Sequence, residues 1–408
     1  MQIDLARLFP RRVTLAAEPD LARALPAHGG VYLLADAAEQ TILLAACEDL
    51  RRVVPARLAA SDGRSRRARL GEIAATLWFR PTFSQFETAL RYLDTVRLVH
   101  PHDYRKRLGF GPAWFIRGEA GATPPRLRVV CECLPGPADH VGPYAARSDA
   151  DAVVAELDDL FDLCRKLDVL RQAPHGRACE YLEMGRCPAP CDGRFPMADY
   201  ARGVNAALRF AAGDRAPRLA ALETNMRQSA ARLAFERAGD LKRRMERAAA
   251  LFARRELQLA GDLDRFGWLI VQRAGPRSSS RRRLKVKPFR VTARQVVEGS
   301  PVGLDEVEAA APHWLAPPTT AGDAPPAEAV AASEQLWCVA HFLFKRPAAR
   351  GLYYAADALP SAALLAADAE REFLRRPEPQ TGEAAPIVSE PPDAPESPST
   401  PDETQAAG

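Results

Sequence analysis

The sequence predicts a multidomain protein of the α+β class. Short apolar stretches of strand length occur in the first hundred residues and again after residue 260, and a long helical stretch lies between them. The 408 residues suffice for two or three domains with a sizeable core. The content of 47% hydrophobic and 26% charged residues is ordinary for a globular chain.

The first hundred residues predict a small α/β unit. "GVYLLAD" and "TILLAA" read as strands joined by a polar turn, which indicates a hairpin. "EDLRRVVPARLAA" reads as a short helix interrupted at Pro55, and "LGEIAATLWF" as a strand. A helix begins at Ser84, because apolar residues follow it at helical spacing. The elements therefore alternate as strand, strand, helix, strand and helix, at residues 30–36, 41–46, 48–60, 70–79 and 84–99.

The middle of the chain begins with a strand at 126–134 and a helix with Ser148 as its N-cap. A helix from Met197 stops at Gly213, and two further helices meet around Phe235 as a hairpin. Apolar stripes on this hairpin predict a buried core or partner face, at Leu219, Leu222, Met226, Leu233, Leu241, Met245 and Leu251.

The last part predicts two strands around a basic loop, followed by two closing helices. The composition of the segment between the strands and the helices predicts a linker. The acidic, proline-rich tail is expected to be disordered. We therefore expect a degenerate nuclease-like domain, a β extension with a cysteine-rich connector, a helical region, a β segment with a basic loop, a linker, C-terminal helices and a tail, at residues 1–105, 106–196, 197–256, 257–316, 317–332, 333–376 and 377–408.

Charge and targeting signals bear on partners and location. The net charge is +4, but the tail holds seven acidic residues and no basic one, so the body carries +11. An excess of this size suits a polyanion such as nucleic acid, although an arginine-rich composition alone would also produce it. No signal peptide and no run of membrane-spanning length is visible, which predicts a cytoplasmic protein with no membrane partner.

Three of the eight cysteines crowd into "CEYLEMGRCPAPCDGRF". Reduced thiols in a loop rich in glycine and proline favour metal binding over a disulfide. Cys179, Cys187 and Cys191 need a fourth ligand to close a zinc or iron–sulfur site, and Cys164 and His175 compete for that place. The alternative is that these three are ordinary buried cysteines. The cysteines in apolar patterns are expected in the core, at Cys47, Cys131, Cys133 and Cys338.

This segment resembles the bacterial UvrC excinuclease family. The family's cysteine-rich run precedes a tyrosine-containing helix that ends in glycine, and an upstream "VGPY" resembles its Phe-Gly-Pro-Tyr. The matching positions here are Cys179, Tyr181, Cys187, Pro190, Cys191, Gly193, Tyr200 and Gly213. The resemblance implies an iron–sulfur cluster on four cysteines, with zinc as the alternative. The family's first cysteine falls near Lys166 here, so Cys164 is the nearest thiol to that place.

The helical hairpin resembles the UVR motif of the same family. Phe235, Glu236 and Ala238 fit its Phe-Glu-x-Ala core, whereas Lys242 and Arg243 replace the Arg-Asp pair that follows. The motif implies binding to a UvrB-like helicase partner. The residues expected to make that contact are Met226, Leu233, Phe235, Glu236, Ala238 and Leu241.

The N-terminal unit resembles the family's GIY-YIG nuclease domain, but most of its site is replaced. The first triad survives as Gly30, Val31 and Tyr32. The residues at the later site positions cannot bind metal or phosphate; they are Leu43, Ala45, Ala46, Val53 and, in place of the metal-binding glutamate, Tyr92. Cleavage by such a site needs a carboxylate for Mg2+ and a cation on the phosphate. We therefore expect neither Mg2+ binding nor catalysis, and only weak catalytic candidates remain, at Tyr32, Arg51 and Arg52.

Three functions follow from these patterns. The resemblance favours a non-catalytic, UvrC-like DNA-binding protein of nucleotide excision repair, acting as an accessory or regulator beside a UvrB-like partner and taking no small-molecule substrate. We find neither the family's RNase H-like motif nor its paired helix-hairpin-helix. The alternatives are a DNA endonuclease with an altered site and a metal-stabilised protein–protein adaptor without DNA binding. The basic loop supplies DNA-binding candidates, or is a solvated hairpin tip, at Arg281, Arg282, Arg283, Lys285 and Lys287.

Overall fold

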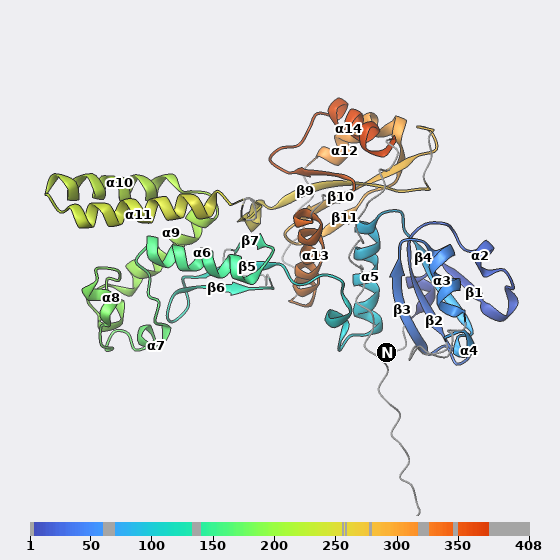
Figure 1. Ribbon diagram of the computed structural model, residues 1–408, viewed down its shortest axis with the longest axis horizontal. Coiled ribbons are helices and arrows are strands. Elements are labelled where there is room, and N and C mark those ends of the chain that lie inside the picture. Colours follow the sequence, from blue (N-terminus) through green and yellow to red (C-terminus); the bar gives the residue numbers. More distant parts are fainter. Residues whose placement is uncertain are drawn as a thin grey trace, which may run out of the picture. The chain divides into compact units, whose positions relative to one another are not determined.

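The computed structural model confirms the predicted α+β class (Figure 1). It describes residues 4–59, 70–132, 140–254, 257, 259–276, 280–316, 326–345 and 350–374. The described residues form three antiparallel sheets and divide into two compact units, with the boundary between Gly109 and Phe110. None of the helices in these ranges has both the length and the apolar character needed to span a bilayer. The predicted disordered tail lies outside the described residues.

The first unit is built on a sheet with strand order β1-β4-β2-β3. The predicted hairpin and the helix capped by Ser84 are confirmed. The predicted strand at 70–79 is wrong in its first half, where residues 70–73 form helix α4 before the chain extends at Thr76. The elements are α1 (Leu5–Leu8), β1 (Arg11–Thr14), η1 (Leu15–Ala17), α2 (Leu21–Ala24), β2 (Gly30–Ala35), β3 (Thr41–Cys47), α3 (Leu50–Leu58), α4 (Leu70–Ile73), β4 (Thr76–Pro81), α5 (Gln85–Val99) and η2 (Tyr104–Arg107).

Two local details of this unit differ from expectation. Helix α3 continues through Pro55 instead of breaking there, because its last turn still forms from Ala59 N to Pro55 O. Strand β1 pairs with β4 although its sequence, "RRVT", has no apolar alternation. Such an edge strand is held by its backbone ladder and not by a buried face.

The second unit begins with a sheet of order β6-β5-β7-β8, against which helices α6 and α9 pack. Gly118 allows the close approach of α9, since a Cβ there would lie 2.7 Å from a methyl carbon of Leu208. Helix α6 begins at Arg147, so the predicted N-cap at Ser148 is wrong, and Ala146 precedes the helix without a side-chain cap. The elements are β5 (Trp114–Glu119), β6 (Arg126–Val130), β7 (His140–Tyr144), α6 (Arg147–Leu160), β8 (Gly261–Asp262) and η5 (Leu263–Arg265).

A cysteine-rich segment and a helical hairpin follow α6 (Figure 1). The segment is mostly loop with three short helical turns, as its glycines and prolines predict. Helix α9 stops before Gly213, whose φ of +118° suits glycine, and α10 and α11 form the predicted antiparallel pair. The elements are α7 (Leu167–Leu170), α8 (Glu180–Glu183), η3 (Pro190–Asp192), α9 (Met197–Ala211), α10 (Ala216–Ala231) and α11 (Phe235–Phe252).

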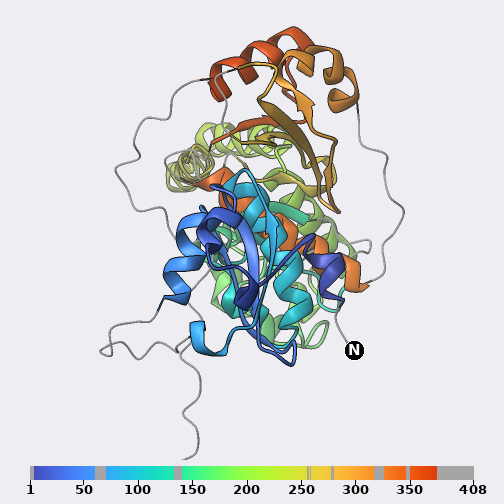
Figure 2. The same ribbon diagram turned by 90° about the vertical axis from the view of Figure 1, so that its right-hand side faces the viewer.

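The C-terminal sheet has the order β11-β10-β9-β13, with β12 also paired to β10, and carries helices α12 and α14 (Figure 2). Helix α12 and strand β13 were not predicted, and the predicted linker is wrong in its second half, where α13 begins at Pro326. Tertiary burial decides here, because α13 is apolar on several sides. The elements are β9 (Gly267–Arg273), β10 (Lys285–Thr292), β11 (Val296–Glu298), β12 (Val302–Gly303), η6 (Leu304–Glu306), α12 (Val307–Leu315), α13 (Pro326–Phe344), β13 (Leu352–Ala355) and α14 (Ala362–Leu374).

The four cysteines expected in the core do not share one environment. Cys47 and Cys338 are buried, as predicted. Cys131 is only half-buried, because it follows the end of β6, where its carbonyl accepts a hydrogen bond from the Trp337 indole. Cys133 lies outside the described residues.

Candidate functional site

The cysteine-rich segment places Cys164 beside Cys187. The Cys164 thiol also donates to the carbonyl of Lys166 at 3.3 Å, and its amide donates to the Tyr200 hydroxyl at 3.0 Å. A hydrogen bond between the two thiols raises the pKa of Cys164 and lowers the pKa of Cys187.

The other two cysteines, Cys179 and Cys191, lie close enough to Cys164 and Cys187 for electrostatic interactions among the four thiols. Cys179 acts on the pKa of both Cys164 and Cys191, and burial raises the pKa of Cys191. His175, the competing fourth ligand, is exposed. The interactions with Cys187 and Cys179 therefore support Cys164 as a companion of the three clustered cysteines.

The donor chemistry of these thiols suits a soft metal or an iron–sulfur cluster. Among the described residues, no set of three or more histidine, cysteine or acidic side chains is placed to hold a metal ion in this structure. We therefore derive no step through a metal, and the cofactor remains a prediction.

An arginine–aspartate network joins the cysteine-rich segment to the hairpin. Arg165 and Arg186, each next to a cysteine in the sequence, both bind Asp159 at the end of α6, at 2.8 and 3.1 Å. From α11, Arg247 also binds Asp159, and the buried Arg244 binds Asp162 at 2.7 Å. Sequence reasoning missed this network because charged residues at helical spacing usually read as a solvated face.

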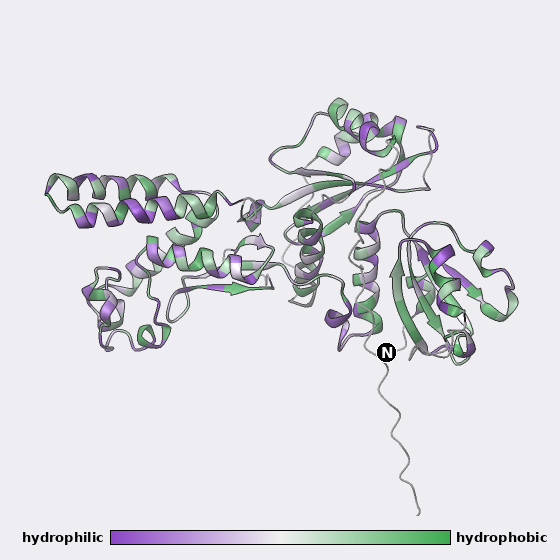
Figure 3. Cartoon of the chain, viewed as in Figure 1, coloured by the Kyte–Doolittle hydropathy of each residue, from purple (hydrophilic) through white to green (hydrophobic). Residues whose placement is uncertain are grey.

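The hairpin divides the predicted partner residues into two groups. Ala238 and Leu241 are buried, and Met226 packs against the same core cluster. The outer end of the hairpin, which we call the hairpin tip, exposes Leu233 and Phe235 with 74% and 65% of their surface accessible. Figure 3 colours the chain by residue hydropathy and shows hydrophobic and hydrophilic residues mixed along both helices of the hairpin. Leu233 has a φ of +58° in the turn between α10 and α11, in the left-handed region that non-glycine residues rarely adopt.

Glu236 is exposed beside Phe235 in the first turn of α11, where its charge favours the helix N-terminus. The predicted contact set therefore consists of an inner group that stabilises the hairpin and an outer group, at the tip, that is available to a partner.

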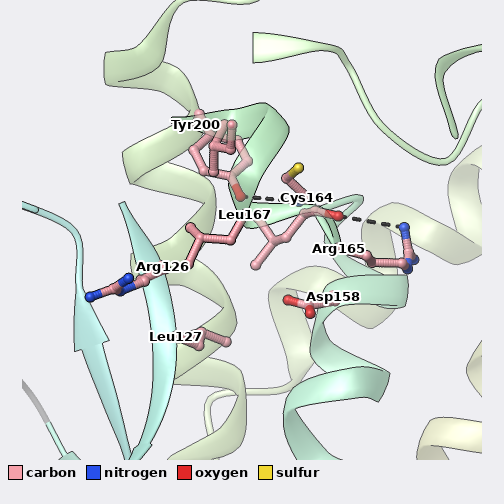
Figure 4. Close-up of a pocket in the computed structure, with 9 residues that line it drawn as sticks. Arg126, Leu127, Asp158, Cys164, Arg165, Leu167 and Tyr200 are labelled. Atoms are coloured by element: carbon pink, nitrogen blue, oxygen red, sulfur yellow. Dashed lines mark hydrogen bonds between the residues drawn. The ribbon is translucent and has the colours of Figure 1, made fainter. Parts of the chain in front are cut away.

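A cavity of about 120 Å³ lies between β6, the end of α6 and α9, next to Cys164 (Figure 4). Asp158, Leu127 and Tyr200 line it. Burial raises the pKa of Asp158 to about 7, although the guanidinium of Arg165 opposes the shift. A carboxyl group with this pKa is partly protonated at neutral pH.

Asp158→Asn is expected to stabilise the fold at alkaline pH. The folded pKa of about 7 lies above the ordinary 3.8, so the native protein loses stability as pH rises from about 4 to about 7. The amide cannot ionise, and the variant should gain up to about 2 kcal/mol at pH 8 and little at pH 4. Urea unfolding at both pH values measures this; an equal effect at the two values would contradict it.

The residues predicted to occupy nuclease-like positions in the first unit pack into an apolar cluster. Tyr32 is fully buried in a cluster with Leu43, Ala45 and Val54, and its hydroxyl makes no hydrogen bond of ordinary geometry among the described residues, although the Arg57 guanidinium lies near it. Burial raises the pKa of Tyr32, an effect that the nearby Arg57 partly offsets. A tyrosine enclosed in this way cannot touch a phosphodiester.

The other site positions agree with this description. Tyr92, at the place of the metal-binding glutamate, is 1% exposed on α5. Arg51 donates its guanidinium Nε–H to the carbonyl of Leu25 at 2.8 Å, and Arg52 is exposed. An acidic residue near the start of α5, Glu87, accepts from the amide of Phe83 and serves as a helix cap.

Tyr32→Phe is expected to leave the protein as stable as before or more stable by up to about 1 kcal/mol. The change keeps the packed ring and removes a buried hydroxyl that makes no hydrogen bond of ordinary geometry among the described residues, so only its weak interaction with the nearby Arg57 is lost. Thermal unfolding measures the effect, with Tyr144→Phe, at another such buried hydroxyl, as a matched comparison. Loss of a Mg2+-dependent nicking activity in Tyr32→Phe would contradict this account.

The predicted basic loop does not form one continuous cationic surface. Arg282, Arg283 and Lys285 are exposed, whereas Arg281 is ion-paired with Glu370. Lys287 lies in β10 on the same face as the exposed Lys285, but it is buried and paired with Glu298, so its place on a DNA-binding surface is wrong. Residues 277–279 of the loop lie outside the described residues.

These features define a multidomain α+β protein in which a cysteine-rich joint connects an antiparallel sheet to a helical hairpin. Residues 113–210, which hold this sheet and joint, match the family model described as "UvrC/Cho excinuclease, middle domain". No solved structure matches the chain significantly.

Curated proteins are similar to this chain over a longer stretch than the family model covers. UvrABC system protein C of Natronomonas pharaonis is 30% identical over 223 residues, which cover 54% of this chain and 38% of that protein. The protein of the same name from Trichlorobacter lovleyi is 28% identical over 220 residues, 54% of this chain and 36% of that protein. The chain is therefore related to the UvrC proteins through about half its length, and it spans less than two fifths of these relatives.

Proposed function

We propose that this chain is a non-catalytic, UvrC-like DNA-binding protein of nucleotide excision repair that pairs with a UvrB-like partner. The exposed hairpin tip carries the proposal. The hairpin buries its own stripe at Ala238 and Leu241 yet leaves Leu233 and Phe235 in water. Large apolar side chains grouped at one exposed end are typical of a partner contact.

The lack of catalysis is supported by the buried Tyr32 and by Tyr92 in place of a metal-binding carboxylate. DNA binding is supported by the relation to UvrC proteins and by the basic body of the chain. A cytoplasmic location is proposed on the same relation.

The test uses the whole chain with labelled duplex DNA and a purified UvrB-like helicase. We expect salt-dependent DNA binding, partner binding, and no incision with Mg2+ or Mn2+. Partner binding without DNA binding would favour the adaptor function instead. Incision of damaged DNA would overturn the non-catalytic assignment.

We propose further that Cys164, Cys179, Cys187 and Cys191 hold a metal group, an iron–sulfur cluster or zinc. Anaerobically purified protein is expected to contain iron and sulfide with absorbance near ~400 nm, or stoichiometric zinc without colour. Cys187→Ser should lose the metal, whereas Cys338→Ser, at a buried cysteine of another core, should keep it. Metal-free native protein would refute the site.

A further inference from the structure

Three arginines and one glutamate lie on one face of the sheet in the second unit. In the pairing of β5 with β6, Arg117 stands opposite Arg128 and Glu119 opposite Arg126. Leu127 and other residues of alternate parity pack into the core on the opposite face. Since successive strand residues point to opposite faces, these four share the face away from that core. We call Arg117, Glu119, Arg126 and Arg128 the arginine face.

The positive charges of this face exceed its negative charge. Glu119 accepts from Arg126 at 2.8 Å and from Arg128 at 3.3 Å, while its nearest oxygen is 4.0 Å from the Arg117 Nε. His140 of β7 is the neighbour of Arg117 on its other side. Like charges placed directly opposite in a sheet are destabilising, so this arrangement costs stability without an added anion.

Arg117 carries the clearest sign of a missing anion. Its Nε is inaccessible to water and has no hydrogen-bond partner among the described residues, although 27% of its side chain is exposed. A desolvated donor without an acceptor is costly in a folded protein. The side chains of Arg126 and Arg128 are 29% and 50% exposed, so an anion can reach the group from solvent.

We infer that the arginine face binds phosphates of a nucleic-acid backbone. Guanidinium groups present planar pairs of donors that match phosphate oxygens, and several of them on neighbouring strands bind a chain of anions better than a single one. The net positive charge of the chain favours a polyanion over an isolated carboxylate. This inference rests on the proposed DNA binding and assigns a location to it.

The test compares two double variants of the whole chain with equal charge change. Arg117→Gln with Arg128→Gln removes two cations from the arginine face. Arg171→Gln with Arg202→Gln removes two exposed cations that pair locally, with Asp168 and Asp199. Fluorescence anisotropy with a duplex of about 30 base pairs gives Kd at several salt concentrations.

The first double variant is expected to bind about tenfold more weakly at 0.1 M salt, with the slope of log K against log salt reduced by about 2. The control should stay within about twofold of the native protein. Glu119→Gln should bind more tightly, which a merely structural role would not produce; circular dichroism verifies that each variant is folded. Equal behaviour of the two double variants overturns this inference alone, and a native chain that binds no DNA overturns the proposed function with it.

Discussion

Leu233→Ala combined with Phe235→Ala is expected to weaken binding of a UvrB-like partner by at least about a hundredfold. These side chains are 74% and 65% exposed, so they contribute little to the native fold and are free to enter a partner's apolar pocket. An aromatic anchor of an interface typically contributes about 2 kcal/mol or more, and two neighbouring anchors exceed that. Isothermal titration calorimetry with the purified partner measures the loss.

The control for the hairpin tip is Leu364→Ala on α14, which removes a side chain that is 51% exposed elsewhere. It should leave partner affinity within about twofold. The tip variant should also unfold at the native urea concentration, because the packed residues Ala238 and Leu241 are untouched. Full affinity in a folded tip variant would remove the hairpin tip from the interface.

Arg244→Ala is expected to lower the free energy of unfolding by about 2 to 3 kcal/mol. Arg244 is 4% exposed, and its guanidinium binds Asp162 at 2.7 Å. Removing one member of a buried ion pair leaves the other charge desolvated and without its closest partner. The loss stays below the upper end of that effect because Arg218 remains 3.6 Å from Asp162. Urea unfolding monitored by circular dichroism provides the value.

Arg243→Ala offers a neighbouring control on the same helix. Its side chain is 66% exposed and lies 3.6 Å from Asp240, so its removal should cost less than about 0.5 kcal/mol. If the two variants unfold within about 0.5 kcal/mol of each other, the network does not anchor the hairpin. A large effect confined to Arg244 would establish that the cysteine-rich segment and the hairpin are held together through α6.

Local sequence patterns predicted many helices and strands correctly, because the caps and stop signals of these elements depend on residues nearby in the chain. Ser84 accepts from the amide of Glu87 at 3.1 Å, and Gly213 ends α9, both as their residue types indicate. The errors fall where packing overrides local preference. Helix α13 extends into a segment whose composition reads as linker, and strand β13 forms only because β9 offers a free edge.

The candidate site could be predicted in part from the sequence, because three of its cysteines lie close together in the chain. The spacing of Cys179, Cys187 and Cys191 indicated a common site, but only the fold shows that Cys164 lies beside Cys187. Lys166, which occupies the place of the family's first cysteine, offers its carbonyl to Cys164 instead of a thiol. No sequence pattern predicts that Asp159 forms ion pairs with three arginines, at positions 165, 186 and 247.

The sequence by itself determined the candidate chemical groups of this protein: a cluster of thiols, a Phe-Glu-x-Ala segment in a helical hairpin, and a strand pair predicted to be nuclease-like but without the expected carboxylate. The tertiary structure alone decided which of these groups meet solvent. Tyr32 is enclosed while Phe235 is exposed, and Arg117 stands opposite Arg128 without a nearer anion among the described residues. The physical reason is that exposure and charge balance depend on contacts between residues far apart in the chain, which residue order does not specify.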